Sequence, residues 1–395
     1  MPVHPERIMS APRYTPVELT AKLVAFDSIS SRSNLALIDF IADYLAAHGV
    51  EAIRLPNPAG DKAALFATIG PVDKPGVVLS GHVDVVPVEG QAWSSSPFEA
   101  RLADDRLYGR GTCDMKGFVA TALALVPEFL TMGLKEPIHL AISYDEEINC
   151  LGSLDMIRRF GTEMPLPRAC IVGEPTLMEV VDAQKSLSGY VTLVTGRPAH
   201  SAMPALGANA LHAAARIIVH LDDIADELRA AGDGSGRFDP AYSTVQAGLL
   251  TAGTAINIVP DEARIVWECR GLPSLPVAFV PDRIRAFSRE VVLPRLRQNA
   301  PEADIVTMQD VSVPPLAPDP GSQAETLALY LAGRNGTQAV SYGTEAGHFQ
   351  LAGVPTVICG PGSIKQAHGA DEWMALSEFE ACAGFLRRLA ATLAD

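Results

Sequence analysis

The chain has 395 residues, of which 48% are hydrophobic and 19% are charged, a composition typical of a globular protein rather than a disordered one. At roughly 150 residues per domain, this length predicts two or three domains. The net charge of -15, with no run of Lys or Arg to offset it, argues against nucleic acid as a partner.

The cysteine pattern and the first residues indicate a cytoplasmic protein. Six cysteines are scattered along the chain without a CxxC pair, which predicts reduced, buried thiols. The first 14 residues, MPVHPERIMSAPRY, lack the apolar stretch of a signal peptide. Because no run of about 18 apolar residues occurs, we expect neither a membrane span nor a membrane partner.

Up to residue 185 the chain alternates between helical and strand-like patterns. A capping box with proline at the first helical position predicts that a helix begins after Thr15. A second helix is predicted over 34–48, with Ser33 as its N-cap and Gly49 as its end. Further strands are predicted at 63–69, 76–80, 138–143 and 170–172, and helices at 115–132 and 151–159. This alternation predicts an α/β/α sandwich, a sheet with helices on both faces.

The pattern changes near Ser186. Strands are predicted at 190–195, 245–250, 254–259, 264–269 and 305–311, and helices at 208–229 and 282–298. This order predicts a ferredoxin-like α+β domain. A proline-rich linker at 314–322 then returns to the first domain, completed by a helix at 324–331, a strand at 355–358 and a helix at 377–393. The prediction is a discontinuous domain, 1–185 and 314–395, with an insertion at 186–313.

Acids and histidines follow several of the predicted strands directly. The apolar runs VVLSGH, HLAISYDEE and CIVGE end on His82, Glu147 and Glu174. Ligands of open α/β sheets bind beyond the carboxyl ends of the strands, so these side chains are expected at one edge. Asp114 and His368 come from glycine-rich turns. Two imidazoles and three carboxylates suit two divalent metals such as zinc, cobalt or manganese, and the lack of a thiolate argues against a structural zinc site.

Two further acids belong to this constellation. Asp84 lies two residues after His82, on the same face of an extended segment, where its carboxylate can accept the second ring N–H of that histidine. Alternatively, Asp84 is a solvated acid in a turn. Glu146 adjoins the ligand Glu147 and is free to take a proton from water and pass it to a leaving amine. This is the equipment of a metal-assisted hydrolase.

These motifs resemble the dinuclear zinc aminoacylase/metallopeptidase family. GHVDVVP (81–87), GRGTCDMKG (109–117) and YDEE (144–147) are together specific for it, and the likeness covers nearly the whole chain. Within the family, the segments GRPAHSAMP (196–204), GTEAG (343–347) and CGPGSIKQAH (359–368) are most similar to the acetylornithine deacetylases.

The resemblance implies a role for each matching residue. Asp114 would bridge two zinc (or cobalt) ions, with one metal site completed by His82 and Glu174 and the other by Glu147 and His368. Glu146 would be the general acid/base and Asp84 the orienting acid. The inserted domain would act as a lid and as the contact of a homodimer. His200 would polarise the scissile carbonyl, often in the neighbouring subunit, and Asn257 and Arg270 would contact substrate.

Physical arguments leave alternatives for the substrate contacts. Arg270 can hold an α-carboxylate through two hydrogen bonds, or it is an exposed sheet residue. His200 has a rationale as an oxyanion donor, or it is an ordinary loop histidine. Glu345 suits the side-chain ammonium of ornithine, or it is a structural acid. Two departures from the deacetylase pattern, Ser186 and His348, bear on the substrate rather than on the chemistry.

The predicted reaction is therefore removal of the acetyl group from N2-acetyl-L-ornithine, giving L-ornithine and acetate, a step of arginine biosynthesis. Related N-acyl-amino-acid hydrolases remain as alternatives: a succinyl-diaminopimelate desuccinylase, an acetylcitrulline deacetylase or a broad aminoacylase. A catalytically inactive binding relative is an alternative of a different class. The presence of every expected ligand and of Glu146 disfavours it.

Overall fold

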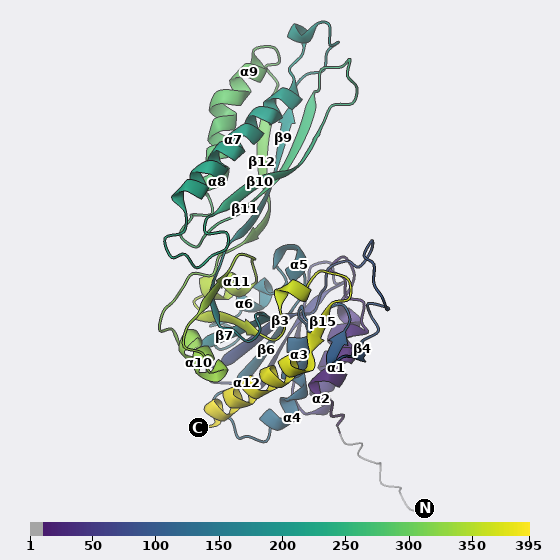
Figure 1. Cartoon of the computed structure of the whole chain (residues 1–395), viewed down its shortest axis with the longest axis vertical. Coiled ribbons are helices and arrows are strands. Elements are labelled where there is room, and N and C mark those ends of the chain that lie inside the picture. The colour runs from purple at the N-terminus through teal and green to yellow at the C-terminus, as the bar shows by residue number, and fades with distance from the viewer. Residues whose placement is uncertain (1–10) are drawn as a thin grey trace, which may run out of the picture. The chain divides into compact units, whose positions relative to one another are not determined.

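The computed structural model describes residues 11–395, and the chain divides into two compact units (Figure 1). The first comprises Met1–Asp182, Asp319–Thr337 and Thr344–Asp395, and the second Ala183–Pro318 and Gln338–Gly343. The predicted insertion, 186–313, falls inside the second unit. The segment on which the signal-peptide prediction depends lies largely outside the described residues. Within 11–395, no helix is long and apolar enough to cross a membrane.

A mixed sheet forms the centre of the first unit. In the part of this sheet that lies in the first unit, the strands follow the order β1-β2-β6-β3-β7-β14-β8. They are β1 (Ala52–Pro56), β2 (Ala63–Ile69), β3 (Val77–His82), β6 (Ile138–Ser143), β7 (Ala169–Pro175), β8 (Val181–Gln184) and β14 (Thr356–Gly360). The four neighbours β6, β3, β7 and β14 are mutually parallel, whereas β1, β2 and β8 pair antiparallel. The carboxyl ends of the four parallel strands therefore meet at one edge.

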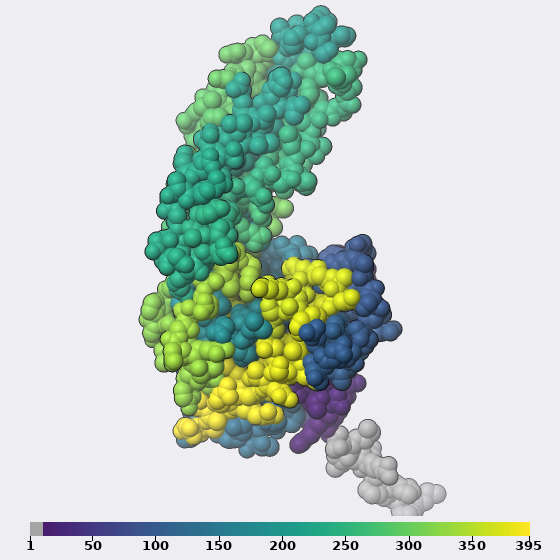
Figure 2. Space-filling view, in the orientation of Figure 1, coloured from purple at the N-terminus to yellow at the C-terminus, as the bar shows by residue number. Residues whose placement is uncertain are grey.

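Helices cover both faces of this sheet, as expected of an α/β/α sandwich. One face packs against α1 (Pro16–Val24), α2 (Leu35–Ala47), α3 (Lys116–Ala124), α10 (Gln323–Ala332) and α12 (Leu376–Ala394). The other face carries Phe66, whose ring centroid lies 5.9 Å from that of Phe160. The ring centroid of Phe160 lies 6.2 Å from that of Phe349 in α11 (Ala346–Leu351). Because both faces are covered, β3, β6, β7 and β14 are buried along their whole length. Figure 2 shows the C-terminal segment, in yellow, lying across the surface of this unit.

Several local details differ from the predicted elements. The capping box of Thr15 and Glu18 is present, but α2 begins one residue later than predicted. Its N-cap position is Asn34, whose side chain instead bonds the backbone of Ala63. The predicted helix 115–132 is interrupted at Leu125 and resumes as α4 (Val126–Phe129), since Pro127 has no N–H to donate to the preceding turn. The predicted helix 151–159 is reduced to α6 (Leu154–Ile157).

Short elements missed by the sequence patterns complete the first unit. A three-stranded antiparallel sheet contains β4 (Arg101–Ala103), β5 (Arg106–Tyr108) and β15 (Trp373–Ala375). A single helical turn, α5 (Glu146–Asn149), follows β6.

The second unit is a four-stranded antiparallel sheet with helices packed on one face. Its strands are β9 (Leu187–Thr195), β10 (Thr244–Ala252), β11 (Glu262–Arg270) and β12 (Asp304–Val313), in the order β10-β11-β9-β12. The helices are α7 (Ala210–Ala231), α8 (Phe279–Phe287) and α9 (Leu293–Arg297), with a π-helical turn, Ser288–Val292, between the last two. The chain order β-α-β-β-α-β is the predicted ferredoxin-like one. The short strand β13 (Gln338–Val340) also belongs to this unit.

The predicted strand 254–259 does not form. This segment is a connection between Gly253, whose φ is +72°, and Pro260. Its apolar alternation is not matched by burial, and Ile256 is fully exposed. Among the described residues, this segment makes one isolated β-bridge, between Ile258 and His200.

Candidate metal centre

The carboxyl edge of the parallel strands brings the predicted ligands together. His82 is the last residue of β3, Glu174 lies at the end of β7, and Glu147 lies in α5 directly after β6. Asp114 lies two residues before the start of α3, and His368 lies in the loop that follows β14. All five residues belong to the first unit.

The five side chains form two adjacent groups that share Asp114. Nε2 of His82 lies 3.1 Å from Asp114 Oδ1 and 3.8 Å from Glu174 Oε1. Nε2 of His368 lies 3.3 Å from Asp114 Oδ2 and 2.9 Å from Glu147 Oε2. The two oxygens of Asp114 therefore face different histidines, the arrangement expected of a carboxylate that bridges two metals.

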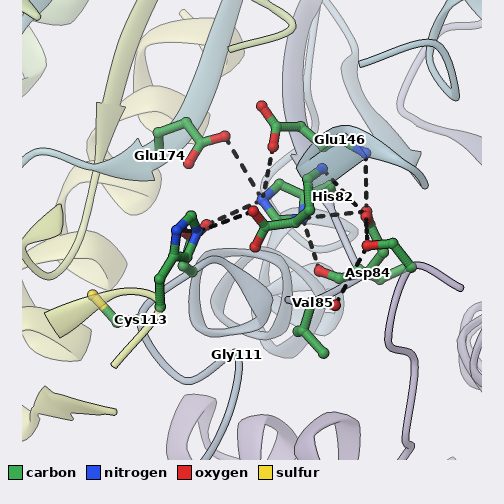
Figure 3. Close-up of polar contacts among 12 residues, drawn as sticks. His82, Asp84, Val85, Gly111, Cys113, Glu146 and Glu174 are labelled. Carbon is green, nitrogen blue, oxygen red and sulfur yellow. Dashed lines mark hydrogen bonds and ion pairs between the residues drawn. The ribbon is translucent and has the colours of Figure 1, made fainter. Parts of the chain in front are cut away.

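Glu146 and Glu147 are separated by the geometry of a helix. The sequence analysis places them at a strand end, but Asp145 adopts a left-handed conformation (φ +56°) and α5 begins at the next residue. Successive residues on a helix point about 100° apart. Glu147 reaches His368, whereas Glu146 Oε2 lies 3.9 Å from Nε2 of His82, and Figure 3 shows Glu146 and Glu174 both directed at that ring.

Asp84 holds the site through its backbone as well as its carboxylate. Nδ1 of His82 lies 2.9 Å from the backbone oxygen of Asp84 and 3.4 Å from its Oδ1. A carbonyl oxygen only accepts hydrogen bonds, so Nδ1 carries a proton and Nε2 faces the acids. The Asp84 carboxylate accepts the backbone N–H groups of Glu146 and Glu147 at 3.2 and 3.3 Å. It therefore orients the two glutamates as well as the histidine (Figure 3).

The centre holds more negative charge than its own residues neutralise. Burial, together with Glu147 and Asp114, raises the pKa of Glu146 to about 8 against the opposing influence of His82. Burial and Asp114 raise the pKa of Glu147 to about 7, and the pKa of Glu174 also lies well above its usual range. Burial alone would lower the pKa of His82, but its bonds to Asp114 and Asp84 raise it well above the ordinary value. Bound cations would relieve this excess of carboxylates.

The donor set fits two divalent metals. Oε1 of Glu174 is buried and has no hydrogen-bond partner among residues 11–395, as expected of an oxygen reserved for a ligand. The candidate ligand atoms of His82, Asp114 and Glu147 lie within 4.8 Å of one another, and so do those of His82, Glu146 and Glu174. Imidazole and carboxylate without thiolate suit zinc or cobalt.

The remaining predicted site residues are Glu345 in the first unit and His200, Asn257 and Arg270 in the second unit. Glu345 is 1% exposed; its Oε1 accepts a hydrogen bond of 2.6 Å from Ser80 Oγ, whereas its Oε2 is buried without a hydrogen-bond partner among residues 11–395. In the second unit, the loops of His200 and Asn257 lie together, since Ser201 N donates to the backbone oxygen of Asn257 at 3.0 Å. Arg270 is the last residue of β11, with Glu268 Oε2 at 3.4 Å.

Two supporting residues escape sequence reasoning. Ser30 Oγ donates to Asp84 Oδ2 at 2.7 Å. Lys62 Nζ donates to the backbone oxygen of Ser30 and to Asp145, just before Glu146. Ser30 lies 54 positions from Asp84, and Lys62 lies 83 positions from Asp145. No spacing pattern in the sequence signals either contact.

Comparison with known proteins agrees with this geometry. Residues 78–392 match the model of peptidase family M20/M25/M40. An acetylornithine deacetylase from Myxococcus xanthus is 34% identical over 381 residues, covering 94% of this chain and 95% of that protein. One from Pasteurella multocida is 29% identical over 365 residues, covering 91% and 92%.

Solved structures show the same fold. An M20 family metallo-carboxypeptidase from Sulfolobus solfataricus superposes with a TM-score of 0.74 at 19% identity, covering 96% of this chain and 99% of that one. A dinuclear metal-binding M20 peptidase from Bacillus subtilis gives 0.67 at 14% identity, covering 95% and 97%. The chain thus belongs to peptidase family M20/M25/M40 and is a metal-dependent hydrolase.

Proposed function

We propose that this chain hydrolyses the amide bond of an N-acylated amino acid, with N2-acetyl-L-ornithine as its substrate and L-ornithine and acetate as products. The observation that carries the proposal is the pair of ligand groups sharing Asp114, with Glu146 beside them. The curated relatives named acetylornithine deacetylase support the choice of acyl group and amino acid.

The metals we propose are two zinc ions, with cobalt as the alternative. His82, Asp114 and Glu174 would hold one, and Asp114, Glu147 and His368 the other. Such cations supply Lewis acidity, which polarises an amide carbonyl and makes water easier to deprotonate. Asp84 keeps Nε2 of His82 directed at its site through the bond of its backbone oxygen to Nδ1.

Glu146 is the proposed proton carrier. It takes a proton from the attacking water and delivers it to the departing amine. A group in this role works best when its pKa lies near the working pH. Burial raises the pKa of the Glu146 carboxyl to about 8, and beside bound cations it would titrate nearer to neutral pH.

The proposed substrate contacts of the second unit lie at opposite ends of one strand. His200 and Asn257 lie beyond the Glu262 end of β11, whereas Arg270 closes its other end. At about 3.3 Å per residue, the nine-residue strand separates them by roughly 26 Å. An acylated amino acid spans only two chain units, about 7 Å. We therefore propose that a second copy of the chain supplies His200 and Asn257 to the substrate that Arg270 holds by its carboxylate, as a homodimer joined through the inserted domain.

A mixture of two inactive variants tests this assignment. Glu146→Gln and His200→Ala subunits, mixed and exchanged, regain activity if the histidine acts across the dimer, because one mixed active site then contains both native residues. If the mixture stays as inactive as its components, the neighbouring-subunit role of His200 is wrong, while the hydrolase function stands.

The substrate is tested by a kinetic comparison in metal-supplemented buffer with free-amine detection. N2-acetyl-L-ornithine is compared with succinyl-diaminopimelate, acetylcitrulline and N-acetylmethionine. We expect kcat/KM to be highest for acetylornithine. Turnover of acetylornithine no faster than that of N-acetylmethionine would rule out the specific proposal.

A broad N-acyl-amino-acid hydrolase is the second candidate. The contact of Glu345 with Ser80 favours it, because this hydrogen bond already occupies one of the two carboxylate oxygens that would meet the ammonium group of ornithine. This candidate predicts similar kcat/KM values for acetylated amino acids with charged and with apolar side chains.

A further inference from the structure

A buried ion pair joins the two loops that carry Asp114 and His368. Nη1 of Arg110 lies 2.9 Å from Oε2 of Glu372, and both side chains are 1% exposed. Arg110 belongs to the glycine-rich turn before Asp114, and Glu372 follows His368 by four positions. Strands β5 and β15 bring the two loops together, because Tyr108 pairs with Trp373 and the next residue, Gly109, donates its N–H to the backbone oxygen of Glu372 at 2.9 Å.

The carboxylate of Glu372 organises the turn that ends at Asp114. Oε2 accepts the backbone N–H of Gly111 at 2.9 Å, and Oε1 accepts those of Cys113 and Asp114 at 2.9 and 3.0 Å. Successive amides can converge on one anion when the backbone includes left-handed conformations, as it does at Gly111 (φ +84°). With Arg110, the carboxylate receives four hydrogen bonds, one of them from the bridging residue itself.

Arg110 continues the same network to the backbone of His368. Its Nη1 donates to the backbone oxygen of Gly369 at 3.2 Å, and its Nη2 donates to Gln91 Oε1 at 2.6 Å. Nε2 of Gln91 donates to the backbone oxygen of His368 at 2.8 Å. His368 adopts a φ of +62°, a left-handed conformation that costs a non-glycine residue on the order of 1–3 kcal/mol and persists only where the surrounding structure imposes it.

We propose that Glu372, Arg110 and Gln91 are positioning residues that assemble one half of the dinuclear centre, the half made by Asp114, Glu147 and His368. This inference rests on the proposed two-metal function. Two of the three ligands in that half depend on the network, namely Asp114 through its amide and His368 through its carbonyl. In the half completed by His82 and Glu174, Asp114 alone depends on it.

Glu372→Gln tests the inference by metal binding rather than by turnover. Glutamine has nearly the same size as Glu372, but its NH2 group would face backbone N–H donors instead of accepting from them. The loss of the carboxylate also leaves the buried Arg110 without its counter-charge. The metal-free protein is titrated with Zn2+ against a competing chelator, and two stepwise affinities are extracted. We expect one of the two stepwise affinities to fall by about 10–100-fold and the other to change much less.

Two further variants separate positioning from general destabilisation. Gln91→Ala leaves the buried ion pair intact but removes the bond to the His368 carbonyl, together with the bonds that Gln91 Oε1 accepts from Arg110 and Trp93. It should weaken the same metal equivalent as Glu372→Gln, and by less. Glu128→Gln is the matched control, because it removes the same charge from an exposed pair with Arg387 in the same unit, and both its affinities should equal those of the wild type.

The outcomes distinguish the inference from the function beneath it. A wild-type protein that binds fewer than two equivalents refutes the dinuclear function itself. Two equivalents in the wild type, with both affinities unchanged in Glu372→Gln and Gln91→Ala, overturn the positioning inference alone. Equal weakening of both equivalents in Glu372→Gln, with a lowered melting temperature and no effect of Gln91→Ala, assigns the cluster to general stability and also overturns it.

Discussion

Replacing Glu146 with glutamine separates two roles that the structure allows for this side chain. Glu146 lies close enough to His82 and Glu174 to serve as a ligand, and it is also free to carry protons. If it is the proton carrier, Glu146→Gln keeps both metal equivalents while kcat falls by about 10²–10⁴-fold. If it is a ligand, the variant loses a metal.

The same variant should be more stable than the wild type when metal-free, and only at high pH. Burial raises the pKa of Glu146 from 4.5 to about 8, which corresponds to about 5 kcal/mol as an upper limit. Between these two pH values the folded protein holds a proton that the unfolded chain has released. The cost of the carboxylate is therefore absent below pH 4.5 and complete above pH 8. Glutamine stays neutral throughout, so the free energy of unfolding gained by the variant should grow from near zero at pH 5 to several kcal/mol at pH 9.

Chemical denaturation of the chelator-treated proteins at pH 5 and pH 9 measures this difference, and elemental analysis after reloading counts the metals. Glu128→Gln serves as the control, because its exposed ion pair with Arg387 contributes little at either pH. An equal change of stability at both pH values would refute the electrostatic argument. A loss of one metal equivalent would refute the assignment of Glu146 as a proton carrier.

Three further predictions test the first unit. Burial lowers the pKa of His139 from 6.5 to about 4, so the unfolded chain binds a proton between these pH values and the folded protein does not. The free energy of unfolding should therefore fall by about 3 kcal/mol as the pH drops from 6.5 to 4. Chemical denaturation at pH 7.5 and 4.5 should show that His139→Leu lacks this dependence. Because the pKa values of Glu146 and Glu147 are raised to about 8 and 7, Zn2+ affinity should rise with pH through this range, and calorimetry in buffers of different ionisation enthalpy should detect released protons. A Cβ at Gly173 would lie 2.1 Å from the ring of Phe118, so Gly173→Ala should lower the free energy of unfolding by about 1–3 kcal/mol. Because Gly173 adjoins Glu174, the variant should also weaken metal binding in the chelator assay.

Long buried strands were the most predictable part of the fold. The predictions for 63–69 and 138–143 coincide with β2 and β6, because strands covered on both faces appear as continuous apolar runs. The short strands β4 and β5 carry no such signal, since several of their residues are exposed. The segment 254–259 shows the converse error, because alternating apolar residues predict a strand only when one face is buried, and here Ile256 is fully exposed.

The clustering of the candidate ligands was predictable from sequence because topology places strand ends together. A sheet with parallel neighbours β6, β3 and β7 must bring the residues after each strand to one edge, whatever the loops between them do. The supporting contacts have no such rule. Glu372 meets Asp114 across 258 positions, through loops whose course depends on tertiary packing, so no local pattern marks it.

The acids of the centre differ in what their oxygens contact, and this difference distinguishes supporting from reactive groups. Asp84 and Glu372 both accept backbone N–H groups, which offset part of the cost of burying their charges and fix their positions. Glu174 has a buried oxygen without a hydrogen-bond partner among residues 11–395, and Glu146 receives only the thiol of Cys150 at 3.3 Å on its carboxylate there. A buried carboxylate without donors is costly unless a cation or a proton neutralises it. Of these four acids, Glu174 and Glu146 have the fewest hydrogen-bond donors, which supports the proposed roles of Glu174 as a metal ligand and Glu146 as a proton carrier.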